Sequence, residues 1–202
     1  MNNQKALSRR ELLRHCKDAA IAATAVSWLS TQHIASAFAY TPKQGGEVTG
    51  KGKLLSFSQL KALQAIAQTI LPATDTPGAG DLDCHGFVDH QLFTCHTEDQ
   101  QGAVKEILTE IQRISVNQGS SSFELLNEQQ RYDLLSGIEA KQGYSDTQRS
   151  QFKFLKELVV FGYFTSQVGA TQALNYQAVP GGYKGSIPAD ENTKSWGSLM
   201  SY

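Results

Sequence analysis

The chain has 202 residues and a formal net charge of −1; 40 % of its residues are apolar and 9 % are aromatic. This composition argues against disorder, and a nearly balanced charge with no basic stripe argues against a nucleic-acid partner. The length suits a single domain that is large enough to bury a hydrophobic core.

The first 39 residues have the three zones of a secretory signal. Basic side chains come first, at Lys5, Arg9, Arg10, Arg14 and Lys17. The apolar stretch over residues 19–29 is shorter than the roughly 20 residues that a membrane-spanning helix needs. Small residues then form two cleavage patterns, which end at Ala37 and Ala39. We therefore expect a signal peptide over residues 1–39.

The basic zone of this signal contains a twin-arginine motif. Ser8-Arg9-Arg10-Glu11-Leu12-Leu13-Arg14 is similar to the consensus of the twin-arginine route, with Leu12 where phenylalanine is common and Arg14 where lysine is common. The residues assigned to the export signal are Ser8, Arg9, Arg10, Leu12 and Leu13. The alternative is an ordinary signal, or an uncleaved anchor, that happens to hold two arginines. Cleavage after Ala39 leaves 13 basic and 17 acidic side chains, a formal charge of −4.

The remaining chain predicts helices behind a linker. Residues 40–55 are rich in Gly and Lys without apolar periodicity, which indicates a flexible linker. Residues 56–170 predict a helical core, because apolar side chains recur every three or four positions. Capping boxes open three of the expected helices, at Ser56-x-x-Gln59, Thr97-x-x-Gln100 and Asn127-x-x-Gln130. A shorter apolar group from Phe87 to Phe93 fits a helix of two to three turns between the first two.

The last expected helix lies between residues 145 and 170 and is apolar on two faces, so we predict a central helix with neighbours on both sides. Its segment "VVFGYF" alone also fits a buried strand, but the length of the surrounding pattern favours a helix. Residues 171–202 form an irregular tail rich in Gly, Pro and aromatic side chains, which is typical of a binding role. The fold class is all-α: a single helical domain with an irregular C-terminal tail, preceded by a signal peptide and a flexible linker.

Metal-ligating residue types gather in the segment "DLDCHGFVDHQLFTCH". The candidates are Asp83, Cys84, His85, Asp89, His90, Cys95 and His96. The two cysteines are eleven residues apart, unlike the C-x2-4-C spacing of zinc sites, and the chain has no H-E-x-x-H motif. A polar helix face with scattered histidines is the other interpretation. A secreted metal-binding protein or metalloenzyme that uses this cluster is therefore the alternative function.

Cys84 and Cys95 are also candidates for a disulfide, because an exported protein enters a compartment where disulfides form. A continuous helix between them separates their Cα atoms by about 16 Å, whereas a disulfide needs roughly 4.4–6.8 Å. Either the helix is broken and the bridge forms, or the helix is intact and each thiol pairs elsewhere, for example with another chain. Cys16 lies in the signal peptide.

Motifs for a bound cofactor or a catalytic nucleophile are absent from the sequence. No C-x-x-C-H segment for haem attachment occurs. The chain also lacks G-x-G-x-x-G, the Walker-type phosphate loop and the G-x-S-x-G elbow. We therefore expect no catalytic, cofactor-binding or metal-binding residue in this chain.

The segment "ILPATDTPGA" predicts a rigid polar loop, which we call the elbow (residues 72–79). Pro72 disfavours helix at the residue before it, and so ends the first helix. The side chains of Thr74, Asp75 and Thr76 can bind nearby backbone amides. Pro77-Gly78 fits the centre of a type II turn. The elbow is either a helix-ending turn of local importance or part of a binding surface.

The elbow, the later segment "FKFLKELVVFGYFTSQVG" and a Tyr-x-x-x-Pro-Gly element (Tyr176 to Gly181) occur in this order. Together they resemble the gluconate 2-dehydrogenase subunit 3 family, over residues from about Phe57 to Ile187. The resemblance implies a small exported subunit without chemistry of its own. It also implies a large FAD-dependent sugar, sugar-acid or polyol dehydrogenase as partner, and a multihaem cytochrome c as a third subunit.

These implications explain the arginine pair, because a twin-arginine leader suits a partner that acquires FAD before export. We expect a periplasmic protein that is exported by the twin-arginine translocase and is membrane-associated through its complex. Tyr and Trp side chains often anchor interfaces. The expected partner interface comprises Pro72, Thr74, Asp75, Thr76, Pro77, Gly78, Tyr176, Pro180, Gly181, Tyr183 and Trp196. A free-standing helical binding module without a redox partner remains a third hypothesis.

Overall fold

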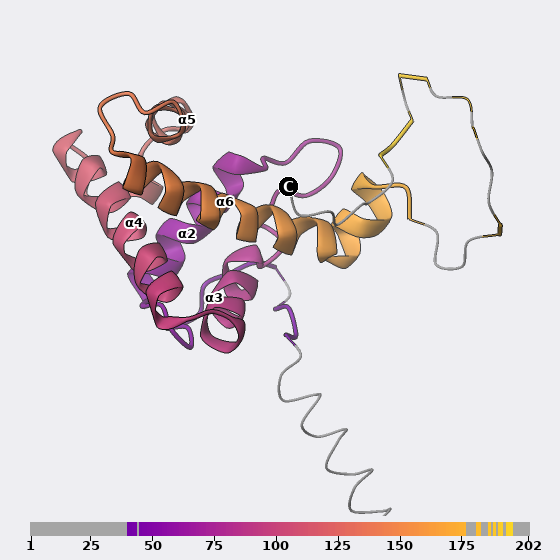
Figure 1. Ribbon diagram of the computed structural model, residues 1–202, viewed down its shortest axis with the longest axis horizontal. Coiled ribbons are helices and arrows are strands. Elements are labelled where there is room, and N and C mark those ends of the chain that lie inside the picture. Colours follow the sequence, from indigo (N-terminus) through magenta and orange to yellow (C-terminus); the bar gives the residue numbers. More distant parts are fainter. Residues whose placement is uncertain are drawn as a thin grey trace, which may run out of the picture. The chain divides into compact units, whose positions relative to one another are not determined.

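Figure 1 shows the protein as a computed structural model. The structure describes residues 40–43, 45–176, 181–182, 186, 188, 190–191 and 193–195. The chain divides into two units, residues 1–41 and residues 42–202, and all the helices named below belong to the second unit. The twin-arginine motif from Ser8 to Leu13 lies outside the described residues and stays a prediction.

The regular secondary structure described in the second unit is helical. The α-helices are α2 (Phe57–Ile70), α3 (Cys84–Cys95), α4 (Glu98–Asn117), α5 (Glu128–Glu139) and α6 (Asp146–Thr165). A short 3₁₀-helix (Phe123–Leu125) precedes α5, and a π-helix (Gly169–Ala173) follows α6. None of the described residues forms a β-strand, so the all-α prediction is confirmed. Within the part of the chain that is described, no helix combines the length and apolar character needed to cross a membrane.

Capping boxes begin four of the five α-helices. Those at Ser56, Thr97 and Asn127 confirm the sequence prediction, and a fourth is formed by Ser145 and Gln148 at the start of α6. In each box the side chain of the N-cap residue accepts a hydrogen bond from the backbone of the residue three positions later, whose own side chain binds back to the N-cap. The helix starts are therefore set by local sequence.

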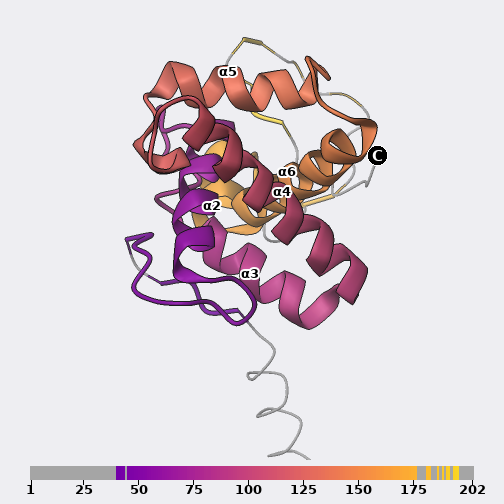
Figure 2. The same ribbon diagram turned by 90° about the vertical axis from the view of Figure 1, so that its left-hand side faces the viewer.

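Helix α6 is the central element of the domain, as its two apolar faces predict. It packs against α3, α4 and α5, and it crosses the domain in Figure 1. Its buried face contributes Phe152, Leu155, Leu158, Val159 and Tyr163 to the core. In Figure 2, α5 lies at the top and α3 at the bottom, with α2, α4 and α6 between them.

Helix α6 ends earlier than its apolar pattern suggests. The pattern continues to Val168, but α6 ends at Thr165, and Ser166 takes an extended conformation. The Ser166 hydroxyl donates to the Tyr163 carbonyl at 2.6 Å and accepts the Gly169 N–H at 3.0 Å. These two bonds turn the chain into the π-helix, where a Cβ on Gly169 would lie 2.0 Å from the Tyr163 carbonyl oxygen. Glycine is therefore required at this bend.

The segment before α2 is packed on the helices, although its composition predicts a flexible linker over residues 40–55. Val48 and Leu55 are buried in the core. The backbone N–H groups of residues 53, 54 and 55 all bind the buried carboxylate of Asp89 in α3. A composition rich in Gly and Lys does not reveal this, because the acceptor lies more than thirty residues away. We call residues 42–43 and 45–55 the strap.

Candidate functional site

The elbow is an exposed loop between α2 and α3, above the C-terminal half of α6 in Figure 1. Its outward side chains are Pro72, Ala73, Thr74, Asp75 and Pro77, all of which are exposed. The backbone closes at the base of the loop, where the Ala79 N–H donates to the Leu71 carbonyl at 2.9 Å. The elbow is thus a closed polar loop that stands on the end of α2.

Side chains inside the elbow fix its tip. The Thr74 hydroxyl donates to the Asp75 carboxylate at 2.9 Å, and this bond holds the pKa of Asp75 below its ordinary value. The Thr74 N–H donates to the Thr76 carbonyl at 3.0 Å. Asp75 is therefore an exposed anion in a defined place.

Tyr163 of α6 ties the elbow to the core. Its ring is buried, and its hydroxyl lies 2.9 Å from the Thr76 hydroxyl and 3.1 Å from the Pro77 carbonyl oxygen. Because a carbonyl can only accept, the phenol donates to Pro77 and accepts from Thr76. Tyr163 lies on the buried face of α6, and its hydroxyl also positions the elbow.

The type II turn predicted at Pro77-Gly78 is wrong. A type II turn needs a positive φ at its third residue, and Gly78 does not have one. A Cβ on Gly78 would lie 2.5 Å from the side-chain amide of Gln68, so that a larger residue here would displace this amide. The same amide oxygen accepts the Gly80 N–H at 2.9 Å. The elbow therefore rests directly on α2.

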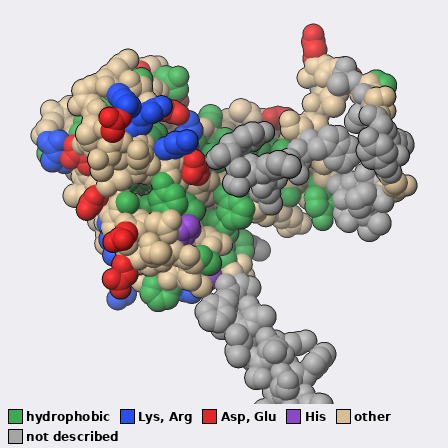
Figure 3. Space-filling view, viewed as in Figure 1, with side chains coloured by type: hydrophobic (Ala, Val, Ile, Leu, Met, Phe, Trp, Pro, Cys, Tyr) green, Lys and Arg blue, Asp and Glu red, His purple; other side chains and the backbone are tan. Residues whose placement is uncertain are grey.

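Apolar side chains are exposed beside the elbow, between α6 and α3 in Figure 3. Phe161 of α6 is 41 % exposed, and its ring centroid lies 5.8 Å from that of Phe87 in α3. Further along α6, Phe154 packs edge-on against His96 at 5.3 Å. The second apolar face that the sequence predicts for α6 thus remains partly open to solvent.

The predicted interface residues of the tail are only partly described. Tyr176 is 60 % exposed, and Gly181 is exposed. Pro180, Tyr183 and Trp196 lie outside the described residues. The tail returns toward the end of the π-helix, because the Asn175 N–H donates to the Ser195 carbonyl at 2.9 Å. Placement of the tail at an interface stays a prediction.

Two carboxylates of the cluster of Asp, His and Cys residues form hydrogen bonds inside the protein. The Asp89 carboxylate accepts the N–H groups of Lys53, Leu54 and Leu55 at 2.6, 3.1 and 2.7 Å. The Asp83 carboxylate accepts the Lys43 N–H at 2.7 Å and lies 3.2 Å from His85 Nε2. Among the residues that the structure describes, no three His, Cys, Asp or Glu side chains come together as a metal site would require. These carboxylates hold the strap.

His85 is buried next to Asp83 and is 2 % exposed. Burial lowers the pKa of His85, while the negative charge of Asp83 opposes this effect. Its Nδ1 atom has no hydrogen-bond partner. A neutral imidazole with its Nε2–H directed at Asp83 and its Nδ1 unprotonated fits these surroundings.

The two cysteines lie at opposite ends of α3, which is unbroken from Cys84 to Cys95. Both thiols are free, and the helix excludes the intrachain disulfide because of the separation that it imposes. Cys84 is buried; burial, with a smaller contribution from Asp83, raises the pKa of its thiol to about 12. Cys95 is exposed.

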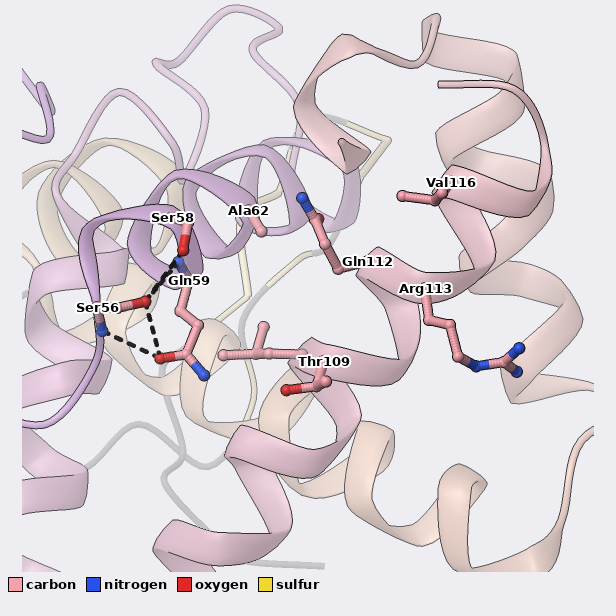
Figure 4. A pocket seen from close by; sticks show the side chains of 9 residues that line it. Ser56, Ser58, Gln59, Ala62, Thr109, Gln112, Arg113 and Val116 are labelled. Carbon is pink, nitrogen blue, oxygen red and sulfur yellow. Dashed lines mark hydrogen bonds between the residues drawn. The ribbon is translucent and has the colours of Figure 1, made fainter. Parts of the chain in front are cut away.

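An open groove of about 490 Å³ lies between the start of α2 and the end of α4 (Figure 4). Its polar lining is largely occupied by local bonds. Gln59 accepts the Ser56 N–H at 3.0 Å, and Gln112 accepts the Phe123 N–H at 3.2 Å. Arg113 is paired with Glu110 on its own helix. The groove therefore assembles no convergent set of free polar groups.

A comparison with protein families identifies the chain. The profile of the family described as Gluconate 2-dehydrogenase subunit 3 matches residues 58–181, more than half of the sequence. The chain belongs to the gluconate 2-dehydrogenase subunit 3 family. No curated protein and no solved structure matches it. The family name describes a subunit of a dehydrogenase, which supports an accessory role.

The residues that match the family profile include α2 from its second residue on, the elbow and α6, and they leave out the strap. The sequence predicted the elbow, but it offered Asp83 and Asp89 only as metal ligands or as part of a polar helix face, and not as acceptors for the strap. The glycine-rich segment upstream carries no signal of this contact, because the acceptors lie 36 and 40 residues away from Lys53 and Lys43. The pairing itself required the structure.

Proposed function

We propose that this protein is the non-catalytic small subunit of an exported FAD-dependent sugar, sugar-acid or polyol dehydrogenase complex. In this proposal it supports assembly of the flavin subunit and carries it through the twin-arginine route. The single observation that carries the proposal is the family match over residues 58–181. The twin-arginine motif in the sequence supports the export part.

The surface of the domain supports partner binding. The elbow presents an ordered anion at Asp75 and two exposed prolines on a loop that Tyr163 holds in place. Ordered loops lose little conformational entropy on binding, which favours their use as contact sites. We infer that the flavin subunit contacts the elbow and the adjoining apolar surface of Phe161 and Phe87.

The chemistry is assigned to the partners. FAD belongs to the large subunit in this proposal, and haem c to a cytochrome subunit that passes electrons onward. The complex is periplasmic and is held at the membrane through its other subunits. The buried carboxylates Asp83 and Asp89 are engaged with backbone N–H groups, so the cluster offers little support for the alternative of a secreted metal-binding protein.

Co-expression of the full chain with its flavin dehydrogenase tests assembly. A tag on the small subunit should recover the large subunit together with the visible absorbance of flavin, whereas the small subunit alone should be colourless and inactive. Asp75→Lys should reduce recovery of the partner, whereas Asp133→Lys, at an exposed position of α5, should not. Turnover of a sugar by the isolated small subunit would contradict the proposal.

Substitutions in the twin-arginine signal test the proposed export route. Replacement of both arginines of the pair, Arg9→Lys with Arg10→Lys, should retain both subunits in the cytoplasm, whereas Arg14→Lys restores the common consensus residue and should permit export. Deletion of the small subunit should trap the flavin subunit as well. Normal export of the flavin subunit in the deletion strain would disprove the escort role.

A further inference from the structure

The strap is held by the helical domain at two separate points. Asp83 binds the N–H of Lys43, and Asp89 binds three consecutive N–H groups from Lys53 to Leu55. Both carboxylates are nearly inaccessible, with 1 % and 3 % exposure. The strap lies beside α2 and α3, as the indigo segment in Figure 2. It can dock only after α3 has formed and packed against α2.

Two glycines allow the strap to approach this closely. A Cβ on Gly52 would lie 2.4 Å from the Asp89 carboxylate. A Cβ on Gly46 would lie 2.5 Å from the Gly80 carbonyl oxygen, and Gly46 also has a φ of +62°. At Gly50, between them, a Cβ would meet no atom within 4 Å. Docking therefore depends on particular glycines and not on glycine content in general.

The strap and the segment that follows the elbow are bound by the same side chain. The Gln64 amide of α2 donates to the Gly46 carbonyl in the strap at 2.7 Å and to the Gly80 carbonyl, just after the elbow, at 3.4 Å. The turn that includes Gly80 runs from Ala79 to Asp83, which binds the strap again. A change in the position of the elbow base thus reaches the strap at Gly46 and at Lys43 through one short turn.

We propose that the strap is a clasp whose docking is coupled to the elbow, so that binding of the partner at the elbow secures the segment that joins the domain to the export signal. The proposal rests on the proposed function, because the partner is the flavin subunit. The strap has two states, docked and released, and release leaves α2 to α6 folded. A partner that prefers the docked state shifts this equilibrium, and docking in turn strengthens partner binding.

Trypsin measures the released state, because Lys51 and Lys53 lie in the strap and cleavage follows the population of the open form. Each cut is followed by mass spectrometry in the purified full chain. Gly52→Ala should speed cleavage at Lys51 about ten-fold or more, while the helical circular dichroism is retained. Gly50→Ala is the matched control and should behave as the unchanged protein. Asp89→Asn, with Asp133→Asn as its control, repeats the test from the helix side.

The coupling is tested by adding the purified flavin subunit. Its binding should slow cleavage at Lys51 several-fold, and Gly52→Ala should weaken binding while Gly50→Ala leaves it unchanged. Failure of the flavin subunit to bind at all would contradict the proposed function. Binding with unchanged strap cleavage, or equal affinity for Gly52→Ala and Gly50→Ala, would overturn the clasp and leave the proposed function standing.

Discussion

The hydroxyl of Tyr163 provides the most direct test of the elbow. Tyr163→Phe keeps the buried ring and removes the atom that binds both the Thr76 hydroxyl and the Pro77 carbonyl. Each neutral hydrogen bond contributes about 0.5–1.5 kcal/mol to stability. Because Pro77 is exposed, its carbonyl can bind water once the phenol hydroxyl is removed. We therefore expect the loss of both bonds to lower the free energy of unfolding by about 1–2 kcal/mol, which is less than the upper limit for two bonds.

Urea unfolding of the mature domain measures this loss, and hydrogen exchange of a peptide over residues 72–79 reports where it acts. Tyr163→Phe should speed exchange in that peptide while exchange in α4 is unchanged. Tyr132→Phe is the control, since Tyr132 is 59 % exposed. If both variants have the same stability and the same exchange at residues 72–79, Tyr163 does not hold the elbow.

Packing and burial lead to three further expected outcomes. Gly162→Ala should destabilise the domain by about 1–3 kcal/mol, because its Cβ would lie 2.7 Å from a phenyl ring of α3; Gly102→Ala, with open space around it, should be neutral or stabilising in the same urea assay. Burial lowers the pKa of His85 in the folded protein below its ordinary value of 6.5. The contribution of the neutral imidazole to stability is therefore complete above pH 6.5 and falls as the pH drops below 6.5. His85→Gln should flatten this decline. In the mature chain a thiol reagent should modify Cys95 rapidly, and Cys84 only on unfolding; equal rates would contradict the burial of Cys84.

Local sequence patterns predicted most of the helices in the domain. The capping boxes at Ser56, Thr97 and Asn127 use side chains and backbone within three residues of one another, so their geometry is written into short segments. The two apolar faces of α6 likewise predicted a helix with neighbours on both sides. The end of α6 was harder, because Val168 continues the apolar pattern while the turn depends on the Ser166 hydroxyl and on Gly169.

The long-range contacts could not be predicted, because each joins segments whose local sequences are uninformative. Lys53 to Leu55 give no sign of a partner, and Asp89 resembles any acidic residue on a polar helix face. The contact exists because burial of unsatisfied N–H groups is costly and a carboxylate can accept several of them. The elbow was found from its prolines and glycine, but its tie to Tyr163 spans 87 residues.

Internal hydrogen bonding also explains why a cluster of ligating residue types is a poor guide to a metal site. Metal binding requires lone pairs that the protein has not already used. In α3 the Asp89 oxygens accept three backbone N–H groups, and the Asp83 oxygens face Lys43 and His85. Of the residues that the sequence marks as metal ligands, Asp83 and Asp89 thus hold the strap, while the exposed anion at Asp75 stands on an ordered loop. This separation of buried, hydrogen-bonded carboxylates from an exposed carboxylate favours a protein that functions through surface contacts.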